Sequence, residues 1–306
     1  AIACPVGINT GTLVKELCFH NNGLLANTIA DVVAANMDKT TTSLRGLMRF
    51  PHALAKIVGY NALENVTRGL FKVGDGLFPL WTQYTPSGSR KIARSIFPAN
   101  DADAPTVVYF PSCITRAMGG PSFGYDESED VPSKMLSLLQ KANYTVIIPE
   151  GKDKLCCGMA FSSKGFRKQA KKKERELNEA LLSATRNGKL PVVCDMSPCL
   201  LHMRETLDPR LKLYDQVDFI HDFLLDRLQF TRQPVSIAIH NTCSTTKMQI
   251  EDKFYRVASL CAEKVIVPEN VTCCGWAGDR GFFHPELNRS ALAPLEHAKL
   301  DATEGY

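Results

Sequence analysis

The sequence lacks several features that would assign a function at once. It has no run of about 18 consecutive apolar residues, so it predicts no transmembrane helix. Its first residues, AIACPVGINTG, do not show the basic start and apolar run of a secretory signal. A GxSxG elbow, a Walker-type phosphate loop and a GxGxxG after the first expected strand are also missing. We therefore expect no serine-hydrolase site and no common nucleotide-binding site.

The charge is too small to indicate nucleic acid. The chain has 306 residues, with 36 Lys and Arg against 32 Asp and Glu, and its net charge is +4. Proteins that bind nucleic acid usually carry a strongly basic face. The densest basic run, residues 171–175, lies in a helical pattern with acids nearby, which favours a solvated helix face. We expect two or three domains and no nucleic-acid partner.

Cysteine is the residue type that stands out. The count is eleven, an odd number, and it includes two adjacent pairs at 156–157 and 273–274. Adjacent cysteines rarely bridge each other, because a disulfide needs a specific separation of the two Cα atoms. In a reducing compartment, clustered cysteines more often bind metal or do redox chemistry. A disulfide framework is therefore disfavoured.

The apolar pattern divides the chain into three parts. Residues 1–85 show apolar positions three and four apart, typical of helices, and the Pro- and Gly-rich residues 85–101 indicate a linker. From Pro105, strands expected at 107–110, 146–148 and 191–193 alternate with helices expected at 133–141, 165–186 and 217–228. This alternation predicts an α/β fold in which a helical N-terminal segment precedes parallel βαβ units.

The α/β pattern then occurs a second time. Strands are expected at 235–239 and 265–267, and VIIPE before the first Cys-Cys-Gly aligns with VIVPE before the second. Ala160 aligns with Ala277, and the Gly-Phe pair at 165–166 aligns with that at 281–282. This is an internal duplication. We expect a helical domain at 1–100, a first Cys-Cys-Gly domain at 101–230 and a second at 231–306.

The first copy contains a candidate metal centre. Its cysteines all fall at or just after expected strand ends: Cys113, Cys156, Cys157, Cys194 and Cys199. The carboxyl ends of parallel strands meet at one edge of a sheet, where sites are built. Thiolate is the ligand of iron–sulfur clusters and of zinc, and a glycine after the pair lets the backbone pass close to a bulky centre. The pattern leaves open which of Cys194 and Cys199 is a ligand.

The second copy contains an incomplete version of this set. Cys243, Cys273 and Cys274 are present, but no later cysteine follows them. The spacing of 36 residues from Gly158 to Cys194, applied to Gly275, falls past Tyr306. We therefore expect the chain to be truncated there, and the missing initiator Met suggests truncation at the other end too.

The two Cys-Cys-Gly repeats resemble a cysteine-rich domain found in several redox proteins. These are heterodisulfide reductase B-type subunits, glycolate oxidase iron–sulfur subunits and FAD-linked D-lactate dehydrogenases. The resemblance covers essentially the whole chain and is best to the last group. Three segments support it: ACPVGINTG at 3–11, YDQVDFIHD at 214–222 and CCGWAGDRGF at 273–282.

The resemblance implies the iron–sulfur, electron-carrying part of a D-2-hydroxy-acid dehydrogenase. Cys4 would be the last cysteine of a ferredoxin-type run whose partners, like the FAD domain, precede Ala1. Clusters of the 4Fe–4S type would pass electrons from FAD to a quinone or cytochrome, in a cytoplasmic protein that can also be peripheral on a membrane. The implied ligands are Cys113, Cys156, Cys157 and Cys199 in one site and Cys243, Cys273 and Cys274 in a second. No residue of this chain would be catalytic.

Other interpretations stay open. The first copy could bind zinc as a structural module, or the cysteine pairs could do thiol–disulfide chemistry without metal. Cys18 and Cys261 lie in helical patterns and are expected in the core. We favour structural roles for His221 and for His240, although His240 could face the second site. Asp279 and Arg280 could serve a cluster or partner, or form a local ion pair.

Overall fold

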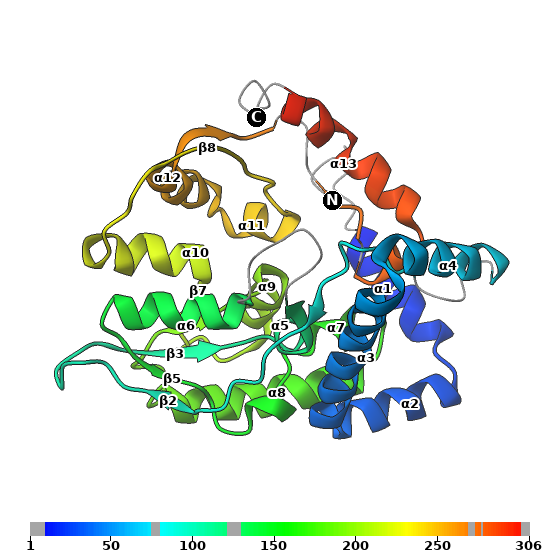
Figure 1. Ribbon diagram of the computed structural model, residues 1–306. Coiled ribbons are helices and arrows are strands. Elements are labelled where there is room, and N and C mark those ends of the chain that lie inside the picture. Colours follow the sequence, from blue (N-terminus) through cyan, green and yellow to red (C-terminus); the bar gives the residue numbers. More distant parts are fainter. Residues whose placement is uncertain (1–9, 75–79, 121–129, 269–272, 277, 301–306) are drawn as a thin grey trace.

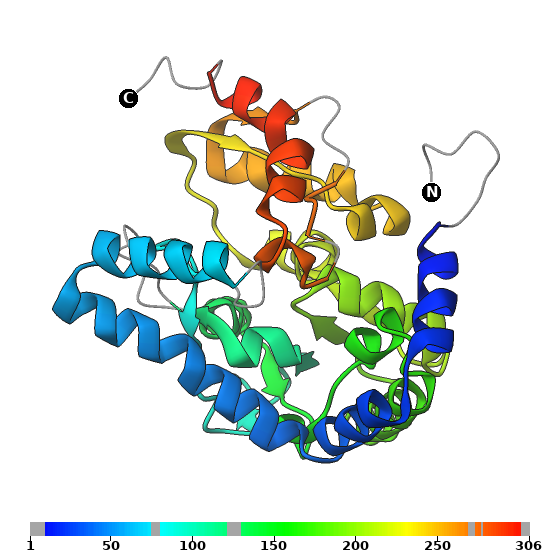
Figure 2. The same cartoon turned by 90° about the vertical axis from the view of Figure 1, so that its right-hand side faces the viewer.

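The computed structural model describes residues 10–74, 80–120, 130–268, 273–276 and 278–300 (Figure 1). Its N-terminal part consists of four helices, as the sequence predicts: α1 (Thr10–Asn21), α2 (Leu24–Ala35), α3 (Met37–Val58) and α4 (Tyr60–Val73). Gly59 separates α3 from α4 at φ +91°, a conformation that residues with a Cβ rarely adopt. In Figure 2 these helices (blue) run along the outside of the first copy (green).

A five-stranded sheet forms the centre of the first copy. Its order is β2 (Ile96–Phe97), β5 (Thr145–Ile147), β3 (Thr106–Phe110), β6 (Val192–Cys194) and β7 (Leu213–Asp215). All neighbouring pairs are parallel except β2 and β5. This confirms the α/β class and the three predicted strands of the first copy.

Helices cover both faces of this sheet. Side chains alternate along β3, so Val108 and Phe110 pack with α8 (Arg167–Ala184) and α9 (Ser197–Thr206). Val107 and Tyr109 face the opposite side and pack with α6 (Val131–Lys141) and Phe219 of α10 (Gln216–Phe219). Burial on both faces explains why this strand is a continuous apolar run.

Shorter elements complete the first copy. They are β1 (Ser87–Gly88), α5 (Cys113–Ala117), β4 (Met118–Gly120) and α7 (Met159–Ser163). A 3-10 turn covers Lys152–Lys154, and α10 continues through a π turn (Ile220–Leu224) into a 3-10 turn (Leu225–Arg227).

Two parts of the sheet differ from the expectation. Residues 85–101 are not only a linker, because they supply β1 and the edge strand β2, which pairs with β5. The short strand β7 was not expected either. Both edge strands contain only two or three residues, too few to show a periodic pattern, and long-range pairing creates them. The proposed domain boundaries at 100/101 and 230/231 remain a prediction.

Among its described residues, the second copy contains the counterpart of only the N-terminal half of the first copy. Strand β8 (Gln233–Ala238) pairs in parallel with β9 (Ala262–Ile266), and α11 (Cys243–Met248) and α12 (Glu251–Cys261) lie between them in sequence. Within the described residues it has no counterpart of β6 and β7. A 3-10 turn (Arg280–Phe282) and α13 (Pro285–Leu300) follow. Lys253 of α12 joins the copies by pairing with Asp218 and, at 2.6 Å, with Asp222.

No helix among the described residues is long and apolar enough to span a membrane.

Acid is expected to destabilise the N-terminal helices through His52. Its Nε2–H donates to the Thr85 carbonyl at 2.6 Å, and its ring packs edge-on against Trp81. Burial lowers the pKa of His52 below 6.5, and the charge of Lys56 acts the same way, although the Thr85 hydrogen bond opposes them. The unfolded chain therefore takes up the proton first, so stability present above about pH 6.5 is lost as the pH falls further.

The measurement is urea unfolding of the wild type and His52→Gln at pH 7.5 and 5.5. Between pH 7.5 and 5.5, the free energy of unfolding should fall more in the wild type than in the variant. The difference between the two falls should be less than about 1.4 kcal/mol per pH unit. Equal losses in the two proteins would contradict this assignment.

Candidate metal centre

Three strand ends bring four thiols of the first copy together. Cys113 is the first residue of α5, directly after β3. Cys156 and Cys157 follow β5, and Cys199 lies in the first turn of α9, after β6. Because β3, β5 and β6 are parallel neighbours, their carboxyl ends share one edge of the sheet, as the strand pattern predicts.

The spacing of these thiols suits metal coordination. The Sγ atoms of Cys113 and Cys156 are 3.7 Å apart, and Cys157 interacts with both Cys156 and Cys199. Two thiolates on one tetrahedral metal atom, each about 2.3 Å from it, lie about 3.8 Å from each other. Cys156, Cys157 and Cys199 are buried, while Cys113 is half-buried. The four residues thus form a soft donor set that is shielded from water.

The geometry favours Cys199 over Cys194 as the fourth member. Cys199 shares a hydrogen bond with Cys157 and interacts with Cys113 through its charge. Cys194 is fully buried at the end of β6, and its Sγ contacts the Met196 carbonyl at 3.8 Å. It therefore lies in the core beside the site. That Cys199 is a ligand remains a prediction.

Asp195 holds the strand ends in place. Its carboxylate accepts hydrogen bonds from Tyr109 Oη at 2.7 Å, Ser112 N at 2.9 Å and Thr115 Oγ1 at 2.8 Å. These contacts clamp the end of β6 to the turn that presents Cys113. Sequence reasoning missed this residue. The sequence signal that could have identified Asp195 is its position directly after Cys194, the cysteine at the end of β6.

The glycine of each Cys-Cys-Gly lets the backbone pass close to a helix. Gly158 has φ +90°, and a Cβ there would lie 2.9 Å from the Ala170 carbonyl of α8. Gly275 has φ +73°, and a Cβ there would collide with the Leu287 carbonyl of α13. Each glycine N–H also points to the first thiol of its pair, at 3.5 Å to Cys156 and 3.3 Å to Cys273. The two copies therefore share their geometry as well as their sequence.

Comparison with protein families identifies the duplicated unit. A model of the cysteine-rich domain named CCG matches residues 107–204 and 237–303, which together make up more than half of the chain. The chain belongs to the CCG cysteine-rich domain family. The two matched segments confirm the duplication, and we call them the first and second CCG domains. Such domains are typical of iron–sulfur oxidoreductases, which supports a redox role in general terms. Neither a curated protein nor a solved structure matches the chain.

The thiols of the first CCG domain differ in how readily they ionise. Hydrogen bonds from Cys113 and Cys157 lower the pKa of Cys156 well below its usual value, and the Gly158 N–H and the charge of Lys173 add to this. The pKa of Cys113 is raised by its hydrogen bond with Cys156 and by burial, and that of Cys157 by Cys156 and Cys199. Without metal, Cys156 therefore becomes a thiolate before Cys113 and Cys157 do.

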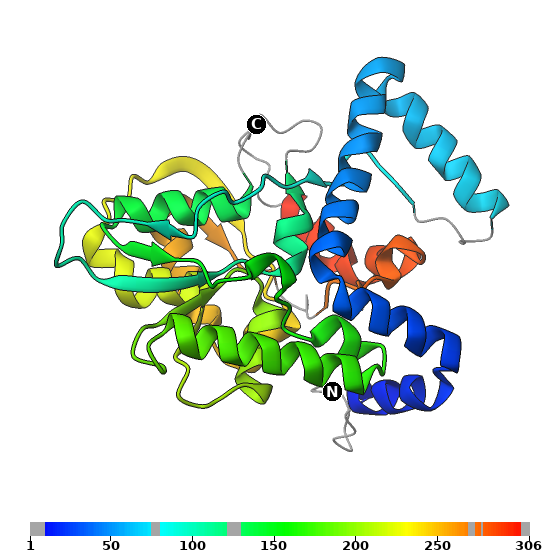
Figure 3. The ribbon, with the colours of Figure 1, turned by 90° about the horizontal axis from the view of Figure 1, so that it is seen from below.

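The N-terminal helices cover the site. Ala30 and Ala34 of α2, with Met37 of α3, pack in one cluster with Cys156 and Phe161. Small side chains let α2 approach closely, and Figure 3 shows it (blue) beside α8 (green). The helical segment is thus part of the wall of the thiol site, which its apolar periodicity alone could not reveal.

The structure does not gather the cysteines of the second CCG domain in the same way. Cys243 and Cys273 are exposed and Cys274 is half-buried. In the described part of the chain, no three His, Cys, Asp or Glu side chains converge closely enough to hold a single metal ion. Cys4 lies outside the described residues. Of the two sites expected in the CCG domains, only the first has its thiols in contact with one another, and there too no three of them converge on a single point among the described residues.

The remaining candidate residues have specific positions. Asp279 pairs with Lys164 at 2.8 Å rather than with Arg280, so one of the two open alternatives, the local ion pair, is not formed and the acid instead joins the two CCG domains. His221 pairs with Asp222 at 2.7 Å. His240 is half-buried, and its Nε2 has no hydrogen-bond partner among the described residues. Cys18 and Cys261 are only half-buried, not fully in the core.

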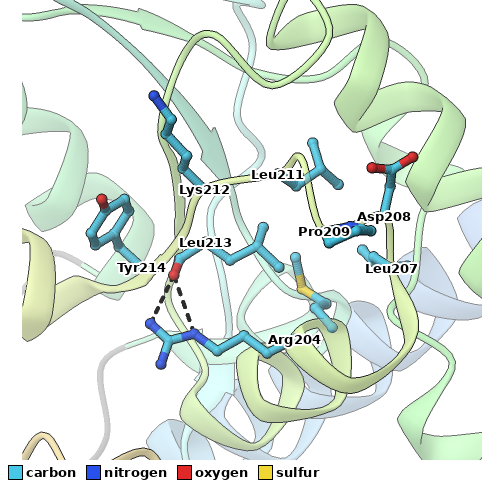
Figure 4. Close-up of a pocket in the computed structure, with 9 residues that line it drawn as sticks. Arg204, Leu207, Asp208, Pro209, Leu211, Lys212, Leu213 and Tyr214 are labelled. Carbon is cyan, nitrogen blue, oxygen red and sulfur yellow. Dashed lines mark hydrogen bonds between the residues drawn. The ribbon is translucent and has the colours of Figure 1, made fainter.

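A cavity of about 450 Å³ lies at the opposite end of β7 from these strand ends (Figure 4). It is lined by the end of α9 and the residues that lead into β7. The Arg204 guanidinium donates to the Leu213 carbonyl at 2.7 Å and pairs with Asp218 at 3.1 Å. None of the residues that line the cavity is a cysteine, so the thiols remain the candidate redox site.

Proposed function

We propose that this chain is the iron–sulfur, electron-carrying part of an FAD-linked D-2-hydroxy-acid dehydrogenase. The observation that carries the proposal is the meeting of Cys113, Cys156, Cys157 and Cys199 at one edge of the sheet. Membership of the CCG family supports the redox class. The dehydrogenase assignment depends on the resemblance of three sequence segments to D-lactate-type enzymes.

The residues of the first CCG domain fit an iron–sulfur cluster. Four thiols are available, and soft thiolate is the preferred ligand of such clusters. A structural zinc site would bind the same thiols to a single ion, and the content of labile sulfide separates the two alternatives. When bound, the cluster would accept and release single electrons.

The protein's own contribution is to hold and shield this centre. The four cysteines fix its position, and Gly158 keeps the loop clear of side-chain bulk. The packing of α2 and α3 over Cys156 excludes water, which strengthens electrostatic interactions inside the site. Half-buried Cys113 is the member of the set nearest to solvent, and it marks the side from which electrons would pass.

The remaining assignments extend this proposal to the intact enzyme. A flavin domain of the same natural chain would supply electrons from a substrate such as D-lactate, and a quinone or cytochrome would accept them. A second centre would use Cys243, Cys273 and Cys274, and Cys4 would belong to a ferredoxin-type site. This chain by itself is not expected to oxidise substrate.

The test is to measure iron, acid-labile sulfide and zinc per chain after anaerobic purification and reconstitution. We expect iron with an equal amount of sulfide, and zinc at background level. Labile sulfide is decisive because only a cluster contains it. Zinc without sulfide would replace the proposal with a structural module, and no metal after reconstitution would leave thiol chemistry.

A further inference from the structure

Two cations are buried beside the thiols of the first CCG domain. The exposed fraction is 3% for Arg116 and 1% for Lys173. Arginine and lysine are almost never fully buried unless they are paired, because removing a charge from water is costly. Each of these two buried charges therefore needs a compensating negative charge nearby.

Neutral groups and one distant acid surround the Arg116 guanidinium. Its Nε donates to the carbonyls of Pro111 and Ser112, at 3.2 and 3.3 Å, and its Nη2 donates to that of Leu155. Nη1 has no hydrogen-bond partner among the described residues, and its ion contact with partly exposed Asp153 is long, at 3.8 Å. The carbonyls satisfy Nε and Nη2 but leave most of the positive charge uncompensated.

The thiols are the other charged neighbours of Arg116. Cys113 lies three residues earlier on α5, so the two side chains share a face of this helix. Charge interactions couple the guanidinium to both Cys113 and Cys156. The charge of buried Asp195 also acts on the guanidinium, but more weakly than that of either thiol. Thiolates at Cys113 and Cys156 would therefore supply negative charge that balances the positive charge of Arg116.

Lys173 approaches the same centre from α8. Its Nζ donates to the Ala34 carbonyl at 3.3 Å and pairs with Glu176, an acid with 35% of its side chain exposed. Ala34 and Ala170, three residues before Lys173, both pack with Cys156. The positive charge of Lys173 lowers the pKa of Cys156. The site is thus flanked by cations from α5 and α8, while Asp153 and Glu176 are partly screened by water.

We propose that Arg116 and Lys173 compensate the negative charge of the thiolate-bound centre and raise its reduction potential. The inference rests on the proposed function. Reduction adds an electron to a centre that already carries the negative charge of its thiolates. A fixed cation in a water-excluded environment stabilises the reduced state more than the oxidised one.

The test is a redox titration of the reconstituted full chain, followed by its visible absorbance and electron paramagnetic resonance. Removing the charge in Arg116→Gln or Lys173→Met should favour the oxidised form at least tenfold at a given potential, or about 59 mV lower for one electron. Arg116→Lys, which keeps the charge, should stay closer to the wild type. Arg204→Met is the matched control, since it removes a guanidinium at the far end of α9 and should leave the potential unchanged.

Iron and sulfide are measured first in every variant. If both charge-removal variants hold wild-type amounts of each and keep the wild-type potential, the inference is wrong. If Arg116→Gln does not assemble the centre, Lys173→Met decides, because its partner Glu176 can turn to solvent. A wild-type chain without iron and sulfide would instead overturn the proposed function, and this inference with it.

Discussion

Replacing Cys156 and Cys157 together with Ser is expected to reduce iron and labile sulfide in the first CCG domain at least tenfold. Cys156 contacts Cys113, and Cys157 interacts with Cys199, so the pair connects all four members of the thiol set. A serine hydroxyl is a hard, protonated group at neutral pH and does not replace a soft thiolate. Iron, sulfide and the visible absorbance of the reconstituted protein measure the loss.

Cys18→Ser with Cys261→Ser is the matched control. Both cysteines are half-buried and outside the thiol set, so this double variant should hold wild-type amounts of iron and sulfide. Single variants then separate the two remaining candidates. Cys199→Ser should lose the centre, whereas Cys194→Ser should keep it. Normal iron and sulfide in the Cys156 and Cys157 double variant would contradict the assignment of this site.

Asp195→Ala is expected to lower the free energy of unfolding by about 3–5 kcal/mol. The change leaves Tyr109 Oη and Ser112 N without their acceptor, and each unsatisfied buried donor costs about 1–3 kcal/mol. Thr115 Oγ1 loses a hydrogen bond as well but can still donate to the Ser112 carbonyl at 3.1 Å. These costs are not simply additive because the donors share one carboxylate. Urea unfolding followed by circular dichroism measures the loss.

Asp195→Asn provides the comparison for this prediction. The amide has the same shape and keeps one acceptor oxygen, so we expect it to lose about half as much stability as the alanine variant. Asp208→Ala is an external control, since Asp208 pairs with exposed Arg210 at the surface and such pairs contribute about 1 kcal/mol or less. A loss below 1 kcal/mol in Asp195→Ala would show that this carboxylate does not clamp the strand ends.

The sequence by itself determined those features that depend on local pattern. Helices at three- and four-residue spacing, the buried runs of β3, β5 and β6 and the apolar runs of β8 and β9 follow from residues close to one another in the chain. The duplication is also readable, because VIIPE and VIVPE stand at the same distance from a Cys-Cys-Gly. The meeting of Cys113, Cys156, Cys157 and Cys199 was predictable too, since parallel strands place their carboxyl ends at a common edge.

Only the tertiary structure decided what lies around those thiols. The edge strands β2 and β7 exist through pairing with distant residues and are too short to show a pattern. Asp195 and Arg116 act through contacts that depend on how separate elements pack, and one-dimensional spacing does not encode such contacts. The burial of Cys156 against α2 joins residues more than a hundred positions apart. Local periodicity places each residue on a face of its own element, but the neighbours that this face meets are set by packing in three dimensions.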